Sequence, residues 1–301
     1  MLVNMKQLDF KYVFMTFFTF IVFVGCSNVI AHKILYQPPK TNKELSKAYF
    51  YKYLDINTSD GIKLSAVKYI TPIDAKGVVL FLHGNADNIT QLPFALLNFV
   101  KEGYDLVLLD YRGYGKSEGS PSPKGLNLDI QAIIKYLSKN LNKNIYIYAQ
   151  SIGGTSLLGT LNQMDKSKIR AIVTEGSFLS YKQLSDATGI SIPFTDYKEL
   201  EPYAPISSDR NMTIPLMLIH SSTDEIIPYS QGLALSKHFI NAEHIKTTGN
   251  HLSYFRFRFN RKKVFDFFDK NKNYQYIPPI KPIISVEDNN ISDDNITKGV
   301  E

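Results

Sequence analysis

The fold of this chain is decided by one stretch, YIYAQSIGGTS at residues 146–156. The stretch starts with β-branched and aromatic residues and ends with small and polar ones, and a helix-compatible segment follows. This pattern predicts a strand that breaks sharply into a helix, with Ser151 at the bend. At such a junction a serine has two interpretations. It is either a nucleophile held on a tight turn or an ordinary helix N-cap.

The residues around Ser151 are small enough for the first interpretation. A tight turn between a strand and a helix leaves little room beside the nucleophile, which is why the usual pattern is G-x-S-x-G. Here Ala149 stands at the first glycine position and adds one methyl group, while Gly153 and Gly154 keep the far side open. The stretch therefore meets the steric demand of a nucleophile turn with somewhat less room.

Strand and helix patterns alternate on both sides of this turn, from about residue 77 to residue 269. Such alternation predicts an α/β fold with a mostly parallel central sheet and helices on both faces. An N-terminal hairpin is expected from residues 49–56 and 62–70, and helical spacing is present at 89–100, 126–137 and 252–269. The expected buried strands are residues 77–84, 104–110, 144–150, 169–176, 214–221 and, more weakly, 242–248.

One segment interrupts the alternation of strands and helices, and the two termini of the chain differ in composition from the residues between them. Residues 178–213 contain several prolines and aromatic residues and are longer than an ordinary connection, so we expect a small cap over the site. The expected organisation is a signal peptide or signal anchor at 1–25, a polar stalk at 26–45, the α/β domain at 46–274, and a largely disordered tail at 275–301.

Two further residues at strand ends could complete a site for acyl transfer with Ser151. Nucleophilic acyl transfer needs a hydroxyl, a base that deprotonates it and an acid that orients the base. Asp224 follows one buried strand and His251 follows the last, and the carboxyl ends of parallel strands meet at one edge. The alternatives are an Asx turn at Asp224 and a surface histidine at the start of a helix.

Other ionisable residues near these strand ends are weaker candidates. Glu175 ends a strand and is a second possible acid. Glu225 adjoins Asp224, but its side chain should point the other way. His220 is expected to be a packing residue, and His83 a structural one.

The segment that ends the first buried strand can supply hydrogen-bond donors. Gly84 lets the backbone come close to a ligand. The N–H of Asn85 is therefore expected to pair with the N–H of Ile152 and form an oxyanion hole.

The order Ser, Asp, His, with each residue at a strand end, resembles that of α/β-hydrolases. The resemblance covers about residues 46–270, and the stretches HGNADN, LDYRGYGKSEG and DEIIP resemble specifically the Bem46/ABHD13-like and serine aminopeptidase S33-type branch. It implies hydrolysis of an ester, thioester or amide through a Ser-His-Asp triad and an acyl-enzyme, without metal or cofactor. It also implies that residues 110–115 form the wall behind the site. Ala149 and Asp87 stand where relatives often carry glycine, and neither change removes a catalytic group.

The N-terminus predicts export or attachment to a membrane. Lys6 and Lys11 precede residues 12–25, which carry no charge. This stretch is short for a membrane-spanning helix, which needs about 20 residues, but suits the apolar core of a signal peptide. It ends at Cys26 in FVGCS, which resembles a bacterial lipoprotein signal and implies that Cys26 is lipidated after cleavage. Cleavage after Ala31 and an uncleaved anchor are the alternatives, and all three place the protein in the cell envelope or outside it.

The amino-acid composition limits the kinds of binding partner that we expect for this protein. The net charge of +6 is dispersed, with no dense Arg/Lys stripe, so a nucleic-acid partner is not expected. The most basic stretch, RFRFNRKK at 256–263, is interpreted as the flank of an amphipathic helix. A single cysteine excludes an internal disulfide. The expected substrate is a small-molecule or lipid-like acyl compound. A non-catalytic binding protein on the same scaffold, a transacylase, and any oligomeric state stay open.

Overall fold

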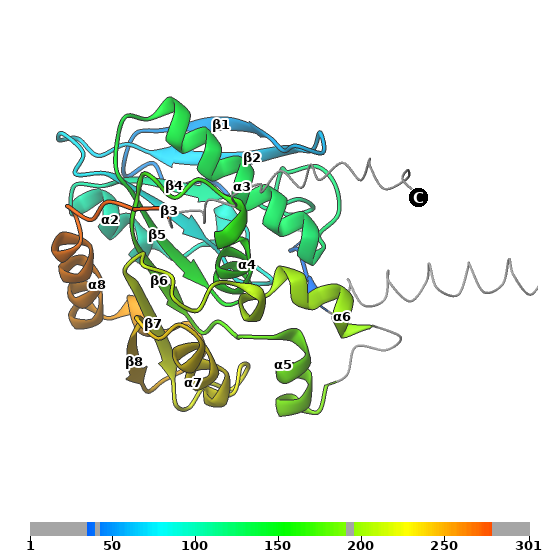
Figure 1. The fold of residues 1–301 in the computed structure, drawn as a ribbon. Coiled ribbons are helices and arrows are strands. Elements are labelled where there is room, and N and C mark those ends of the chain that lie inside the picture. The colour runs from blue at the N-terminus through cyan, green and yellow to red at the C-terminus, as the bar shows by residue number, and fades with distance from the viewer. Residues whose placement is uncertain (1–34, 40–42, 191–195, 279–301) are drawn as a thin grey trace, which may run out of the picture.

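The computed structural model describes residues 35–39, 43–190 and 196–278, and it confirms the predicted α/β fold (Figure 1). Cys26, Ala31 and most of the expected tail lie outside the described residues. One eight-stranded sheet has the order β1-β2-β4-β3-β5-β6-β7-β8. Its strands are β1 (Tyr51–Asn57), β2 (Lys63–Tyr69), β3 (Val78–Leu82), β4 (Asp105–Leu109), β5 (Ile145–Gln150), β6 (Ile169–Glu175), β7 (Leu216–Ser221) and β8 (Glu243–Thr247).

The sheet is antiparallel at one edge and parallel elsewhere. β1 and β2 form the expected hairpin, and β2 also pairs antiparallel with β4. From β4 to β8 every pairing is parallel. The carboxyl ends of β3, β5, β6, β7 and β8 therefore meet at one edge, which is where the polar residues singled out above follow their strands.

Apolar residues on alternate sides of the central strands build a core on each face of the sheet. Along β3, Val78, Leu80 and Leu82 belong to one buried cluster, and Val79 and Phe81 belong to the other. The first cluster contains side chains of α3 (Pro123–Asn140), α4 (Ile152–Thr160) and α7 (Tyr229–His238). The second contains side chains of α2 (Asn98–Lys101) and α8 (Arg258–Lys270). Both faces are thus covered by helices, as a buried parallel sheet requires (Figure 1).

The helix expected at residues 89–100 is broken into three pieces, so this prediction is wrong. The pieces are η1 (Ile89–Gln91), η2 (Phe94–Leu97) and α2. Pro93 is the physical reason, because proline has no N–H to donate and its ring disfavours a helical conformation in the residue before it. Leu92 is accordingly extended, with φ −63° and ψ 146°.

The segment expected to form a cap contains several short helices. They are α5 (Tyr181–Thr188), α6 (Tyr197–Leu200), η4 (Glu201–Tyr203) and η5 (Pro205–Ser207), and the last two pack against α4 (Figure 1). The remaining short helices are η3 (Leu161–Gln163) and η6 (Tyr254–Arg256). Across the described ranges, none of the helices combines the length and the apolar character needed to cross a membrane.

Candidate active site

Ser151 lies at the bend between β5 and α4 in a backbone conformation that is rare for serine. Its φ is 51° and its ψ −122°. Its N–H donates to the carbonyl of Glu175 at 2.8 Å, and its own carbonyl accepts from the N–H of Thr155 at 3.0 Å. A strained conformation of this kind costs about 1–3 kcal/mol and persists only where the surroundings impose it. The Ser151 side chain makes no capping hydrogen bond to α4, so the N-cap interpretation does not describe it.

Small residues make this turn possible. A Cβ atom on Gly153 would lie 2.5 Å from both the carbonyl oxygen of His83 and the hydroxyl of Tyr111, and one on Gly154 would strike the hydroxyl of Ser177. Ala149, in contrast, is fully buried within the core of the sheet. Its methyl group is accommodated there, and the missing first glycine leaves the turn intact.

The structure brings His251 and Asp224 to the hydroxyl of Ser151. Nε2 of His251 lies 3.0 Å from Oγ of Ser151, and Nδ1 lies 2.7 Å from Oδ2 of Asp224. The other carboxylate oxygen of Asp224 accepts the N–H groups of Ile226 and Ile227 at 2.9 and 2.8 Å. Asp224 thus forms an Asx turn and binds the imidazole at the same time, so its two interpretations do not compete.

The surroundings of Asp224 keep it ionised. Its side chain is fully buried, and burial by itself would raise its pKa. The hydrogen bonds from His251 and from the two backbone N–H groups favour the carboxylate and outweigh burial, so the pKa of Asp224 lies below its ordinary value. Asp224 can therefore hold the imidazole in one orientation with Nδ1 protonated, which leaves Nε2 free to accept a proton from Ser151.

The loop after β3 closes over the nucleophile from the other side. A Cβ atom on Gly84 would lie 3.4 Å from Cβ of Ser151, so the loop lies directly beside the nucleophile. Ala86 has a φ of 60°, and it and Ser151 are the non-glycine residues with positive φ in the described part of the chain. The side-chain oxygen of Asn85 accepts from the hydroxyl of Tyr114 at 2.8 Å and from the N–H of Gln37 at 2.7 Å. The loop is therefore held in one shape beside the start of α4.

Two buried groups behind this loop are structural. Asp110 accepts the N–H of Ile89 at 2.8 Å, and burial raises its pKa to about 6. His83 is fully buried, with Nδ1 2.7 Å from the carbonyl oxygen of Gly84, and burial lowers its pKa to about 4. His83 is accordingly uncharged near neutral pH and packs against Tyr111, as its structural interpretation predicts.

The chain is similar to several known proteins. Residues 73–196 match the family model described as serine aminopeptidase, S33. The protein YfhR of Escherichia coli K12 is 32% identical over 161 residues, which are 52% of this chain and 55% of YfhR. The protein Bem46 of Schizosaccharomyces pombe is 29% identical over 196 residues, covering 62% of this chain and 64% of that protein.

A solved structure extends the likeness to a larger part of the chain. The Pyrococcus furiosus esterase Pf2001 superposes with a TM-score of 0.64 at 21% identity, covering 79% of this chain and 98% of the esterase. The chain therefore has the α/β-hydrolase fold. The match to YfhR spans little more than half the length of that protein.

Glu225 has a role in this site that the sequence did not predict. Its side chain was expected to point away from the histidine, and this is wrong. The carboxylate accepts the backbone N–H of His251 at 3.0 Å. An exposed glutamate next to the acid thus fixes the loop that carries the base.

His220 is the packing residue that was predicted, and it also lies against the acid. Its Nε2 is 2.9 Å from the carbonyl oxygen of Ile227 and 3.4 Å from Oδ2 of Asp224. Because a carbonyl oxygen only accepts, Nε2 carries the proton. Burial lowers the pKa of His220, so the ring stays neutral. It therefore packs against Asp224 without forming a second ion pair with it.

Glu175, the second possible acid, supports the loop that carries His251 instead. One carboxylate oxygen accepts from the hydroxyl of Tyr148 at 2.6 Å and from the amide of Gln150 at 2.9 Å. The other accepts the N–H of Tyr254 at 2.8 Å, three residues after His251. Burial raises the pKa of Glu175. Because Asp224 already occupies Nδ1 of His251, Glu175 acts on the loop rather than on the imidazole.

Proposed function

We propose that this protein is a serine hydrolase of the α/β-hydrolase superfamily, and that it cleaves an ester, thioester or amide bond through an acyl-enzyme. The observation that carries the proposal is the continuous chain of contacts from Asp224 through His251 to Ser151, with distances of 2.7 and 3.0 Å. The strain at Ser151 supports it, because a purely structural serine gains nothing from that conformation. The match to a serine aminopeptidase model and the fold shared with an esterase agree with this class of reaction.

The geometry suits two successive acyl transfers. His251 takes the proton of the Ser151 hydroxyl as Oγ attacks the acyl carbonyl, and Asp224 stabilises the imidazolium that forms. The N–H groups of Asn85 and Ile152 are proposed to bind the oxyanion, since their loop and helix flank the nucleophile. His251 then protonates the leaving group. A water deprotonated by His251 attacks the acyl-enzyme, releases the acid and regenerates Ser151.

The proposed substrate is a small-molecule or lipid-like acyl compound. The geometry of the triad is the same for a transacylase, in which an alcohol or amine takes the place of the attacking water. Rates measured on p-nitrophenyl esters of increasing chain length, with and without an added alcohol acceptor, separate the two. Formation of a new ester in preference to the free acid would identify a transacylase.

A fluorophosphonate probe tests the proposal directly, since it reacts only with an activated serine. We expect the wild-type protein to be labelled and Ser151→Ala to be unlabelled. Ser156→Ala is a matched control, because Ser156 is buried in α4 and its hydroxyl has no partner among the described residues. This variant should be labelled like the wild type. Equal labelling of wild type and Ser151→Ala would refute the proposal.

We further propose that lipidated Cys26 tethers the enzyme to a membrane of the cell envelope. Each buried CH₂ group of an acyl chain contributes about 0.8 kcal/mol, so two or three chains give firm attachment. In a bacterial host, wild-type protein should be shortened and should incorporate radiolabelled fatty acid, while Cys26→Ala should remain unlabelled at its full length. Equal incorporation by both proteins would contradict lipidation at Cys26.

A further inference from the structure

Exposed aromatic and basic residues alternate along one edge of the active site. Phe94, Phe257 and Phe259 are 76, 60 and 70% exposed. Phe94 begins η2, which packs against η6. Phe257 lies between η6 and α8, and Phe259 lies in the first turn of α8. Arg256 and Arg258 each precede one of these two phenylalanines in sequence and are also exposed. We call these five residues the aromatic–basic rim.

The rim borders the catalytic residues. η6 begins three residues after His251, and Glu175 holds its first N–H. Burial raises the pKa of Asp87, and the nearby positive charge of Arg256 lowers it. Arg256 therefore lies close to Asp87. Asp87 in turn follows the loop of Asn85. The rim is thus continuous with the oxyanion loop on one side and the histidine loop on the other.

Packing of α8 does not require the rim. Its apolar contacts with the sheet come from Val264, Phe267 and Phe268, which are buried. Three neighbouring cations have partners within the fold: Arg261 donates to backbone carbonyls, Lys262 pairs with Asp266, and Lys263 lies 5.1 Å from the ring centre of Phe259. In contrast, neither Arg256 nor Arg258 forms a salt bridge with another described residue.

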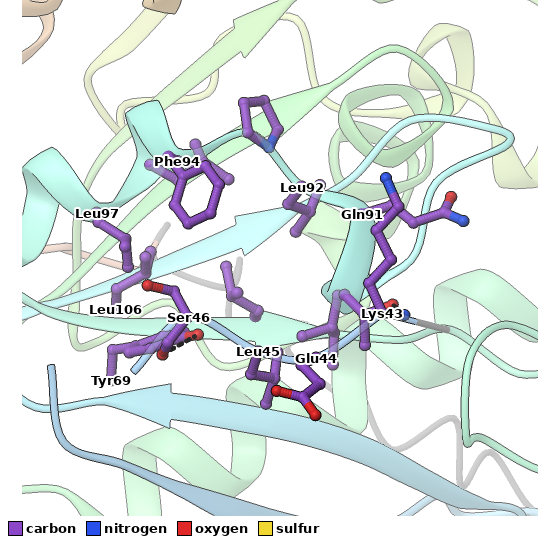
Figure 2. Close-up of a pocket in the computed structure, with 15 residues that line it drawn as sticks. Lys43, Glu44, Leu45, Ser46, Tyr69, Gln91, Leu92, Phe94, Leu97 and Leu106 are labelled. Carbon is purple, nitrogen blue, oxygen red and sulfur yellow. Dashed lines mark hydrogen bonds between the residues drawn. The ribbon is translucent and has the colours of Figure 1, made fainter. Parts of the chain in front are cut away.

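The N-terminal segment contacts the loop of Asn85 and then reaches Phe94. The N–H of Gln37 donates to the side chain of Asn85 at 2.7 Å, and the N–H of Lys43 donates to Thr90 at 2.9 Å. The segment then lines an apolar cavity of about 260 Å³ together with Phe94 (Figure 2). Cys26 precedes the first described residue, Leu35, by nine positions, which an extended chain spans in about 30 Å. A tether at Cys26 would therefore keep Leu35 within about 30 Å of a bilayer.

We propose that the aromatic–basic rim docks on an anionic lipid surface and places the mouth of the active site against it. Aromatic rings favour the boundary between lipid headgroups and acyl chains, and arginines nearby bind the lipid phosphates. The inference rests on the proposed function in one respect: it makes the substrate an acyl group presented at the membrane. The length of the tether favours a lipid surface over an acidic protein as the partner.

The chain contains no tryptophan, so a single tryptophan can report where the rim lies. Full-length Phe259→Trp is incorporated into vesicles of phosphatidylcholine and phosphatidylglycerol in equal amounts, with and without brominated acyl chains. Phe50→Trp is the matched control. Phe50 is 73% exposed and precedes β1, whose first residue pairs through β2 with the amino-terminal end of β4, at the edge of the sheet opposite the site.

On incorporation into the vesicles, the tryptophan emission of Phe259→Trp should shift to shorter wavelength. Brominated lipid should quench this emission about twofold or more strongly than it quenches that of Phe50→Trp. Vesicles of phosphatidylcholine alone, or the added changes Arg256→Gln and Arg258→Gln, should remove this difference. Equal quenching at both positions, as expected if the rim meets a protein instead, overturns the proposal. If quenching is the same without phosphatidylglycerol and without both arginines, the proposal that the rim binds an anionic lipid surface is refuted. Fluorophosphonate labelling of Phe259→Trp in detergent reports the catalytic proposal separately, since it requires no vesicle.

Discussion

Replacing Asp224 with asparagine should lower kcat for ester hydrolysis by about 10⁴-fold while the protein remains folded. The amide oxygen of asparagine can keep both hydrogen bonds of the Asx turn to Ile226 and Ile227. The amide nitrogen then faces Nδ1 of His251, where the carboxylate oxygen lies at 2.7 Å in the wild type. Because that nitrogen donates, it favours the tautomer with Nε2 protonated, which cannot accept the proton of Ser151.

Glu175→Gln is the control that separates the two candidate acids. It also replaces a buried carboxylate with an amide near the histidine loop, but the carboxylate it removes binds Tyr148, Gln150 and the N–H of Tyr254. We expect its kcat to stay within about tenfold of the wild type, because the tautomer of His251 does not change. Both variants are assayed on one p-nitrophenyl ester after circular dichroism has shown that they are folded. A greater loss in Glu175→Gln than in Asp224→Asn would make Glu175 the acid.

The strands and the nucleophile turn could be predicted because their signals are local. A buried strand is a continuous apolar run, and the turn at Ser151 is marked by Ala149, Gly153 and Gly154 within a few residues. Asp224 and His251 could be placed because parallel strands bring their carboxyl ends to one edge. The sheet topology thus brings Asp224 and His251, which are 27 residues apart in sequence, to within 2.7 Å of each other.

The supporting contacts could not be predicted, because they depend on how separate loops approach one another. Glu225 folds back onto the N–H of His251, and His220 comes within 3.4 Å of Asp224 across a single turn. Neither residue carries a motif. The break at Pro93 had a visible signal, because proline inside a helical pattern ends the helix, and the apolar spacing around it concealed the break. Local chemistry should therefore have outweighed periodicity there.

Replacing Arg112 with methionine should lower the free energy of unfolding by about 3–5 kcal/mol. Arg112 follows β4 in the wall behind the site, and its side chain is largely buried. Its guanidinium donates to Asp129 at 2.8 and 2.9 Å and to Asp60 at 2.8 and 3.0 Å. The Asp129 side chain is fully buried, so removal of the cation leaves a carboxylate without its charge partner in the core. Urea unfolding followed by circular dichroism measures the loss.

Two further variants show whether the uncompensated charge causes this loss. Adding Asp129→Asn to Arg112→Met removes the buried charge, while the amide oxygen can still accept the backbone N–H of Arg112, which lies 2.8 Å from the carboxylate. The double variant should therefore be more stable than Arg112→Met alone. Lys262→Met breaks an exposed pair with Asp266 and should cost no more than about 1 kcal/mol. If Arg112→Met cost no more than Lys262→Met, the network behind the site would contribute little, and the wall would owe its shape to apolar packing.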